Sequence, residues 1–137
     1  MKLDPSAFLA DPDLIQVLEE RSAPVPCSGD RVLFHQGEMP SGLYILDSGH
    51  ATLTMKTPSG QPVVDVEARA GSLLGLPGLI GNEPYTLTAI ARNGAQIRFV
   101  SRDDLNALMK STPAVAIKIL QVLAAEVRSA RRAMADR

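Results

Sequence analysis

The chain of 137 residues has few of the residues that most often carry metal and redox chemistry. A single cysteine, Cys27, excludes an internal disulfide and any iron–sulfur or zinc site built from several thiolates. The only histidines, His35 and His50, lie at opposite ends of a predicted strand pair and form no H-x-H motif. Cupin-type metalloenzymes need two or three converging histidines plus a carboxylate. A metal-dependent enzyme is therefore the least favoured class, and we expect no metal site.

Charge of one sign and long apolar runs are also scarce. The net charge of −1 gives no overall bias toward nucleic acid or an anionic membrane. No apolar run approaches the roughly 18–20 residues of a membrane span, and the acids and prolines of residues 1–13 do not resemble a signal peptide. We therefore expect a cytoplasmic protein without membrane contact, folded as a single domain over residues 1–137.

The middle of the chain, from about residue 31 to residue 100, alternates apolar and polar residues in short segments separated by turn signals. The Asn93-Gly94 pair is the strongest hairpin signal, because a type I′ turn needs two residues at positive φ. The predicted strands are residues 32–35, 43–46, 51–56, 63–67, 86–90 and 96–100. Many short strands at this spacing predict a mainly β fold of jelly-roll type, also called a double-stranded β-helix.

Helices are predicted on both sides of this β-roll. The first 21 residues favour a helix in which Asp11 is a cap and Pro12 is the first helical residue. After the strands, residues 101–104 form a cap followed by acids, and Thr112-Pro113 starts a second C-terminal helix. No glycine or proline interrupts residues 114–136, so the last helix is predicted to be long, about 35 Å.

Apolar residues of the last helix are spaced 4, 3, 4, 3 and 4, which is a heptad pattern. This heptad seam consists of Ala116, Leu120, Leu123, Val127, Ala130 and Met134. A second stripe, Val115, Ile119 and Val122, lies on another face and is predicted to pack on the β-roll. The seam predicts a homodimer through the last helix. One broad apolar face that only covers the β-roll is the alternative.

Residues 71–91 are punctuated by glycines at 71, 75, 78 and 81. Glycine lets the backbone approach a ligand closely and exposes peptide N–H groups, as in anion-binding turns. The stretch nevertheless contains no arginine or lysine, and its one carboxylate is Glu83. This stretch therefore resembles a phosphate-binding turn but lacks the cation that would neutralise a phosphate.

Two groups of residues resemble the signatures of the cyclic nucleotide-binding domain family. The first group is Gly37-Glu38, the apolar run 43–46 and Gly49. The second, residues 74–79 followed by Thr88-Ala89, resembles the phosphate-binding cassette of that family. The details are most similar to the sensor domains of the catabolite-activator and fumarate–nitrate-regulator (Crp/Fnr) superfamily, in which a Pro-Tyr pair such as Pro84-Tyr85 is common. The resemblance covers about residues 10–135 and implies a ligand-sensing, non-enzymatic regulatory domain.

Two positions depart from the cassette pattern. Leu76 stands where family members that bind cyclic nucleotides carry the glutamate for the ribose hydroxyl, and Leu87 stands where they carry the arginine for the phosphate. Strand alternation places Arg92 on the opposite face from Leu87. The resemblance implies a degenerate ligand pocket that disfavours cyclic nucleotides. Its candidate residues are Gly75, Leu76, Pro77, Gly78, Leu87, Thr88 and Ala89.

Two functional hypotheses therefore stay open ahead of the enzyme. In the first, the chain is a homodimeric sensor whose pocket takes a ligand other than a typical cyclic nucleotide. In the second, it is a ligand-free module that binds another protein. Regulators of this superfamily continue into a helix-turn-helix after the dimer helix, whereas this sequence stops at Arg137, so direct DNA binding is not expected.

Overall fold

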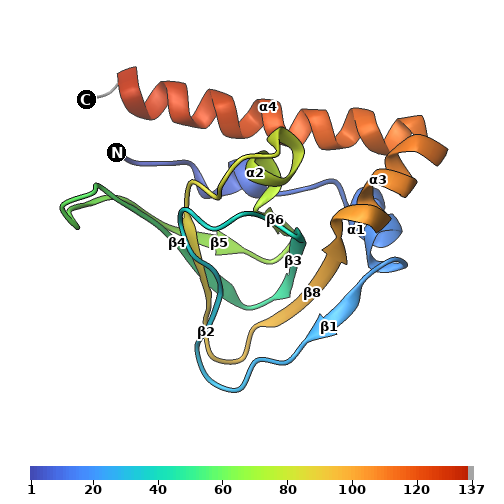
Figure 1. Cartoon of the computed structure of the whole chain (residues 1–137), viewed down its shortest axis with the longest axis horizontal. Helices are drawn as coiled ribbons and strands as arrows, with labels where there is room; N and C mark the ends of the chain where they lie inside the picture. Colours follow the sequence, from blue (N-terminus) through green and yellow to red (C-terminus); the bar gives the residue numbers. More distant parts are fainter. Residues whose placement is uncertain (136–137) are drawn as a thin grey trace.

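The computed structural model describes residues 1–135, which form two antiparallel four-stranded sheets flanked by helices (Figure 1). The strands are β1 (Ala23–Val25), β2 (Arg31–Phe34), β3 (Gly42–Ser48), β4 (His50–Lys56), β5 (Pro62–Arg69), β6 (Ser72–Leu74), β7 (Thr88–Ala91) and β8 (Gln96–Ser101). One sheet has the order β1-β8-β3-β6 and the other β2-β7-β4-β5. This topology confirms the predicted jelly-roll.

The helices gather on one side of the roll. They are the 3-10 helix η1 (Pro5–Phe8), α1 (Pro12–Glu19), α2 (Leu76–Gly81), α3 (Arg102–Ser111) and α4 (Pro113–Ala135). The last helix has 23 residues, or about 35 Å, and lies across the end of the roll (Figure 1). Within the described residues no single helix is long and apolar enough to cross a membrane. The pair α3 and α4 reaches that length and composition only when joined across a bend of 119°.

Strand β3 separates two hydrophobic cores. Its residues Tyr44 and Leu46 face the space between the two sheets, where Phe34, Leu53 and Ala89 also pack. Its residues Leu43 and Ile45 face the opposite side, against α1, α3 and α4. Because successive side chains of a strand point to opposite faces, the part of β3 with a core on each side, residues 42–46, is apolar throughout, and its polar residues follow at the end.

The long helix α4 is fixed to the second core by the stripe predicted for that purpose. Val115, Ile119 and Val122 are all buried among residues of α1, α3 and β3. Near the start of α4, the Lys118 ammonium lies 2.7 Å from the Asp11 carboxylate. That ammonium, together with the backbone amide of Asp13, lowers the pKa of Asp11. Asp11 thus both caps α1 and holds α4 against it.

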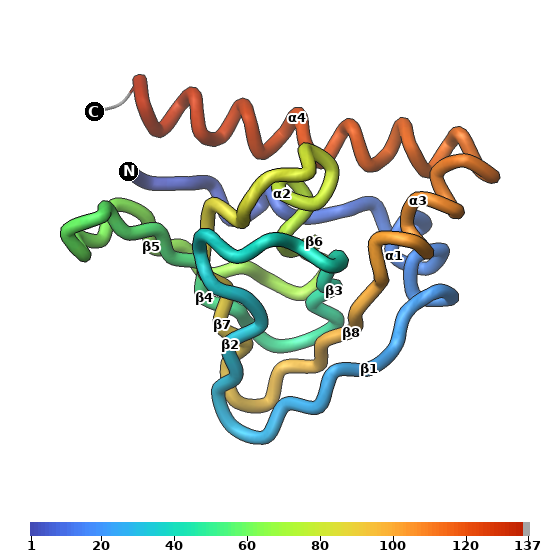
Figure 2. Tube along the Cα trace, viewed as in Figure 1, coloured from blue at the N-terminus to red at the C-terminus, as the bar shows by residue number. Residues whose placement is uncertain are grey.

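The N-terminal segment is not the single helix that was predicted. Asp11 and Pro12 do begin α1, and the Asp11 carboxylate accepts the Asp13 amide at 2.7 Å. Before them, η1 ends at Phe8, and Ala10 donates its amide to the Gly71 carbonyl oxygen at 2.9 Å. Pairing with the segment around Gly71 holds the backbone extended and separates the two helices. As a result residues 1–8 run beside the C-terminal half of α4 (Figure 2).

Three short elements were not predicted: β1, β6 and α2. Strand β1 contains Pro24 and lies at a sheet edge, where a residue without an N–H is tolerated. Strand β6 is buried on both faces, so it shows no alternation. The strand predicted at 86–90 is observed at Thr88–Ala91, two residues later at its start.

Candidate functional site

The cassette (residues 74–89) joins β6 to β7 through the short helix α2. Gly75, the residue before α2, has φ of 91°, a left-handed conformation that glycine adopts readily. A Cβ atom at this position would lie only 2.7 Å from Cε1 of Tyr85. Glycine is therefore required at position 75 for both conformation and space.

Tyr85 connects the two family signatures. Its amide donates to the Glu38 carbonyl oxygen at 2.9 Å, and its own carbonyl oxygen accepts the Gly37 amide at 2.8 Å. The Tyr85 hydroxyl donates to the Gly42 carbonyl oxygen at 3.2 Å, and burial raises its pKa to about 12. The Tyr85 backbone thus fixes the turn after β2 against the cassette, and its neutral hydroxyl ties the cassette to the start of β3.

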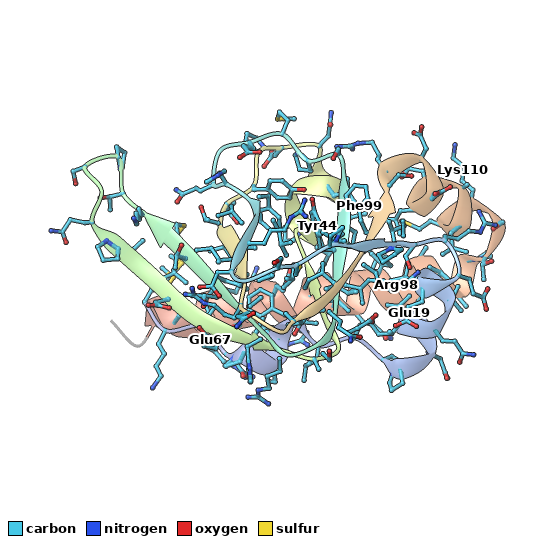
Figure 3. All side chains as sticks on the ribbon, turned by 90° about the horizontal axis from the view of Figure 1, so that it is seen from below. Glu19, Tyr44, Glu67, Arg98, Phe99 and Lys110 are labelled. Atoms are coloured by element: carbon cyan, nitrogen blue, oxygen red, sulfur yellow. The ribbon has the colours of Figure 1, made fainter. Side chains whose placement is uncertain are left out.

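Four of the chain's five aromatic residues extend from this point across the roll. The rings of Tyr85 and Phe34 are stacked with centroids 3.8 Å apart, and Phe34 lies 5.8 Å from Tyr44. Tyr44 in turn packs against Phe99 at 5.0 Å (Figure 3). The cassette is therefore supported by a continuous row of aromatic contacts in addition to the hydrogen bonds of Tyr85.

A cavity of about 370 Å³ lies between the cassette, the β4–β5 hairpin, the N-terminal segment and α4. Small-molecule sites are commonly about 300–1,000 Å³ and largely apolar. The cavity is lined mostly by apolar side chains, among them Phe8, Phe34, Leu53, Met55, Val64 and Leu74. Among the residues that the structure describes, its lining contains no arginine, lysine or histidine. Its chemistry therefore suits an apolar ligand.

The predicted pocket residues divide into two groups. Gly75, Pro77, Gly78 and Leu87 line the cavity. The other three, Leu76, Thr88 and Ala89, lie outside its lining. Leu76 is fully buried in the core beneath the helices, and Ala89 is buried between the sheets. The Thr88 hydroxyl accepts the Gln36 amide at 2.9 Å.

The heptad seam also divides in two. Leu123, Val127, Ala130 and Met134 contribute to the cavity lining, whereas Ala116 and Leu120 do not. Val127 and Met134 lie at the rim, because they line the cavity and are also 50% and 58% exposed. Leu120, which lies closer to α3 along the helix, is also 58% exposed. The last four of the six seam residues are therefore part of the cavity wall.

Glu126 is a cavity residue that the sequence analysis missed. It lies on α4 between Leu123 and Ala130, and its Oε2 atom is buried with no hydrogen-bond partner among the described residues. Burial raises its pKa to about 8. One signal was present in the sequence: Glu126 is the only acidic residue within α4, three positions after one seam residue and four before another.

Arg92, four residues after Thr88, points away from the cavity, and Arg102 donates to the backbone carbonyl oxygen of Leu79 in α2. Nε of Arg92 donates to the Thr52 hydroxyl at 2.7 Å, and its Nη1 lies 3.0 Å from Asp30 Oδ2. The Thr52 hydroxyl donates in turn to Glu67, on the outer side of β5 (Figure 3). Arg92 therefore belongs to a network outside the cavity. Within residues 1–135 no cluster of three or more His, Cys, Asp or Glu side chains could hold a metal ion.

Comparison with known proteins agrees with this architecture. Residues 25–112 match the family model described as the cyclic nucleotide-binding domain. The chain therefore belongs to the cyclic nucleotide-binding domain family, and its fold is that of a Crp/Fnr sensor domain.

Among individual relatives, the chain is 24% identical over 126 residues to the "CRP-like cAMP-activated global transcriptional regulator" of Mycobacterium tuberculosis, covering 92% of this chain and 56% of that protein. The catabolite activator protein of Thermus thermophilus matches with a TM-score of 0.79 at 22% identity, covering 96% of this chain and 62% of that one. Oxidized CprK in complex with o-chlorophenolacetic acid matches with a TM-score of 0.75 at 15% identity, over 94% and 53% of the two chains. The chain thus spans little more than half the length of the curated relative.

Proposed function

We propose that this chain is a sensor domain whose cavity binds a small apolar molecule in place of a typical cyclic nucleotide. The observation that carries the proposal is Leu87, which stands at the position of the phosphate-pairing arginine and lines a cavity whose described lining contains no arginine, lysine or histidine. A charge-assisted contact to phosphate contributes about 1.5–3 kcal/mol, and burying an anion without a cation is unfavourable. The CprK complex supports a non-nucleotide ligand in this fold.

The proposed output is a change at a dimer interface formed by the heptad seam. Leu123 and Ala130 are half-buried residues of the cavity wall, so a ligand that contacts them presses on the same helix that presents Leu120 and Met134 outward. Shifts of helices at subunit interfaces are a common switching element. A ligand in the cavity would then alter the packing of α4 on a second copy.

A ligand-free module that binds another protein is the second candidate function. Ile117, Leu120 and Met134 favour it, because each is 58% exposed on α4. The cavity favours the sensor instead, since a disused pocket is expected to be filled by side chains and this one retains about 370 Å³.

Isothermal titration with cyclic AMP and cyclic GMP tests the proposal. No binding is expected up to millimolar concentration, and micromolar binding of either nucleotide would contradict the ligand assignment. The M. tuberculosis regulator, named as cAMP-activated, is the positive control.

The variant Leu87→Arg tests whether this position decides the outcome. A guanidinium in the cavity wall is expected to raise the affinity for cyclic AMP by tenfold or more, or about 1.4 kcal/mol. The control is Leu33→Arg, which adds the same charge at a half-buried strand residue outside the lining. Equal affinities of the two variants would show that Leu87 is not the determinant.

A further inference from the structure

Glu126 is the only acidic residue in the described lining of the cavity. Most residues of the lining are apolar, and the buried Oε2 atom of Glu126 has no hydrogen-bond partner among the described residues. Buried polar atoms in proteins are almost always paired. An unpaired carboxyl oxygen beside a cavity therefore indicates a partner from outside the chain, either a water molecule or a ligand that occupies the cavity.

The surroundings of Glu126 define what that partner is. Burial alone raises its pKa, with no contribution from a charged group, so none compensates the carboxyl. The Ser129 hydroxyl, three residues further along α4, accepts the Asp4 amide at 2.8 Å and makes no hydrogen bond with Glu126 Oε2. An anionic ligand would meet no arginine, lysine or histidine side chain in the described lining, and a carboxylate would be repelled once Glu126 is ionised. A donor, above all a cationic one, is the complementary group.

We propose that the cavity binds a lipophilic amine, with its hydrocarbon body against the apolar walls and its ammonium group against the Glu126 carboxyl. This inference rests on the proposed function, because it names the ligand class of the same cavity. An aliphatic ammonium has a pKa of about 10.4, above the value of about 8 for Glu126. The ligand therefore keeps its proton, Glu126 releases its own to solvent, and an ion pair forms.

Four probes with the same phenyl ring and two-carbon chain separate the contribution of the polar end group from that of the hydrocarbon body. They are phenethylamine, phenethyl alcohol, phenylacetate and ethylbenzene. Each is titrated at pH 7 into the full chain with labelled methionine and leucine methyl groups, and binding is followed by NMR shifts at Leu53, Met55 and Leu123. Phenethylamine is expected to bind at least about tenfold more tightly than phenylacetate, which corresponds to about 1.4 kcal/mol. Calorimetry in buffers of different ionisation enthalpy is expected to show proton release for the amine alone.

The variant Glu126→Gln keeps the side-chain volume and removes the charge. Its affinity for phenethylamine is expected to fall about tenfold, to that of phenethyl alcohol, with ethylbenzene unchanged. The matched control is Glu83→Gln, at an exposed position outside the lining. Thermal unfolding establishes that both variants are folded.

Three outcomes would overturn the amine assignment: equal affinity for phenylacetate, an unchanged amine affinity in Glu126→Gln, or no binding of any of the four probes. The proposed function fails separately, if cyclic AMP binds with micromolar affinity.

Discussion

The backbone amide of Asp4 donates a hydrogen bond of 2.8 Å to the hydroxyl of Ser129, joining the two ends of the described chain. Ser129 is buried, and both residues border the groove between the N-terminal segment and α4. This contact closes one side of the cavity wall. Removing the Ser129 hydroxyl therefore tests how the N-terminal segment is held.

Replacing Ser129 by alanine removes the acceptor of the Asp4 amide. We expect a loss of about 1 kcal/mol in the free energy of unfolding, because a partly buried donor is left without its partner. Urea unfolding measures the change. Ser28→Ala, at an exposed position, is the control and is expected to change stability by less than about 0.5 kcal/mol.

Gly75→Ala is expected to destabilise the protein far more than an alanine at Gly60. Both glycines have φ near +90°, so both variants carry the same backbone strain, about 1–2 kcal/mol. Only at Gly75 would the new Cβ also collide with the Tyr85 ring; at Gly60 nothing lies within 4 Å. The difference between the two unfolding free energies isolates that contact, and equal losses would show that the ring moves away freely.

The stability of the protein should depend on pH through Glu126. Its folded-state pKa of about 8 lies above the ordinary value of 4.5, so the folded state holds the proton more tightly than the unfolded state does. This stabilisation is complete below about pH 4.5 and is lost as the pH rises to about 8. The loss amounts to at most a few kcal/mol.

Glu126→Gln isolates that effect from the other titrating groups. Any difference in stability between variant and wild type near pH 5 reflects the substitution itself. At pH 9 the variant should be more stable relative to the wild type than it is at pH 5. Denaturant unfolding at both values measures this. A difference between wild type and variant that does not change with pH would show that Glu126 is not buried as a neutral acid.

Leu120→Glu tests the dimer predicted from the heptad seam. Leu120 is 58% exposed, so the substitution should leave the monomer fold stable, while a buried charge in a helix–helix interface would dissociate the dimer. Analytical ultracentrifugation measures the mass. Met39→Glu is the control at the same exposed fraction outside the helices, and a monomeric wild type would contradict the prediction.

The sequence was informative where a periodic pattern had a single physical cause. Alternation identified most strands, and the stripe containing Ile119 identified the face of α4 that packs in the second core. The glycine-rich stretch was recognised as special, although α2 within it was not, because six residues with two glycines carry no helical periodicity.

The places of Leu76, Leu87 and Glu126 depend on tertiary contacts that the sequence does not show. Leu76 and Leu87 occupy comparable places in the cassette pattern, yet Leu76 packs under the helices and Leu87 lines the cavity. Glu126 resembles any surface acid of an amphipathic helix until the roll and the N-terminal segment close around it. Both distinctions depend on contacts between residues far apart in the chain.

Because its walls come from the N-terminal segment, the β4–β5 hairpin, the cassette and α4, the cavity exists only while α4 stays docked. Any molecule inside it stabilises that docked state relative to one in which the end of the helix swings free. Occupancy should therefore slow amide hydrogen exchange along the C-terminal turns of α4 most strongly.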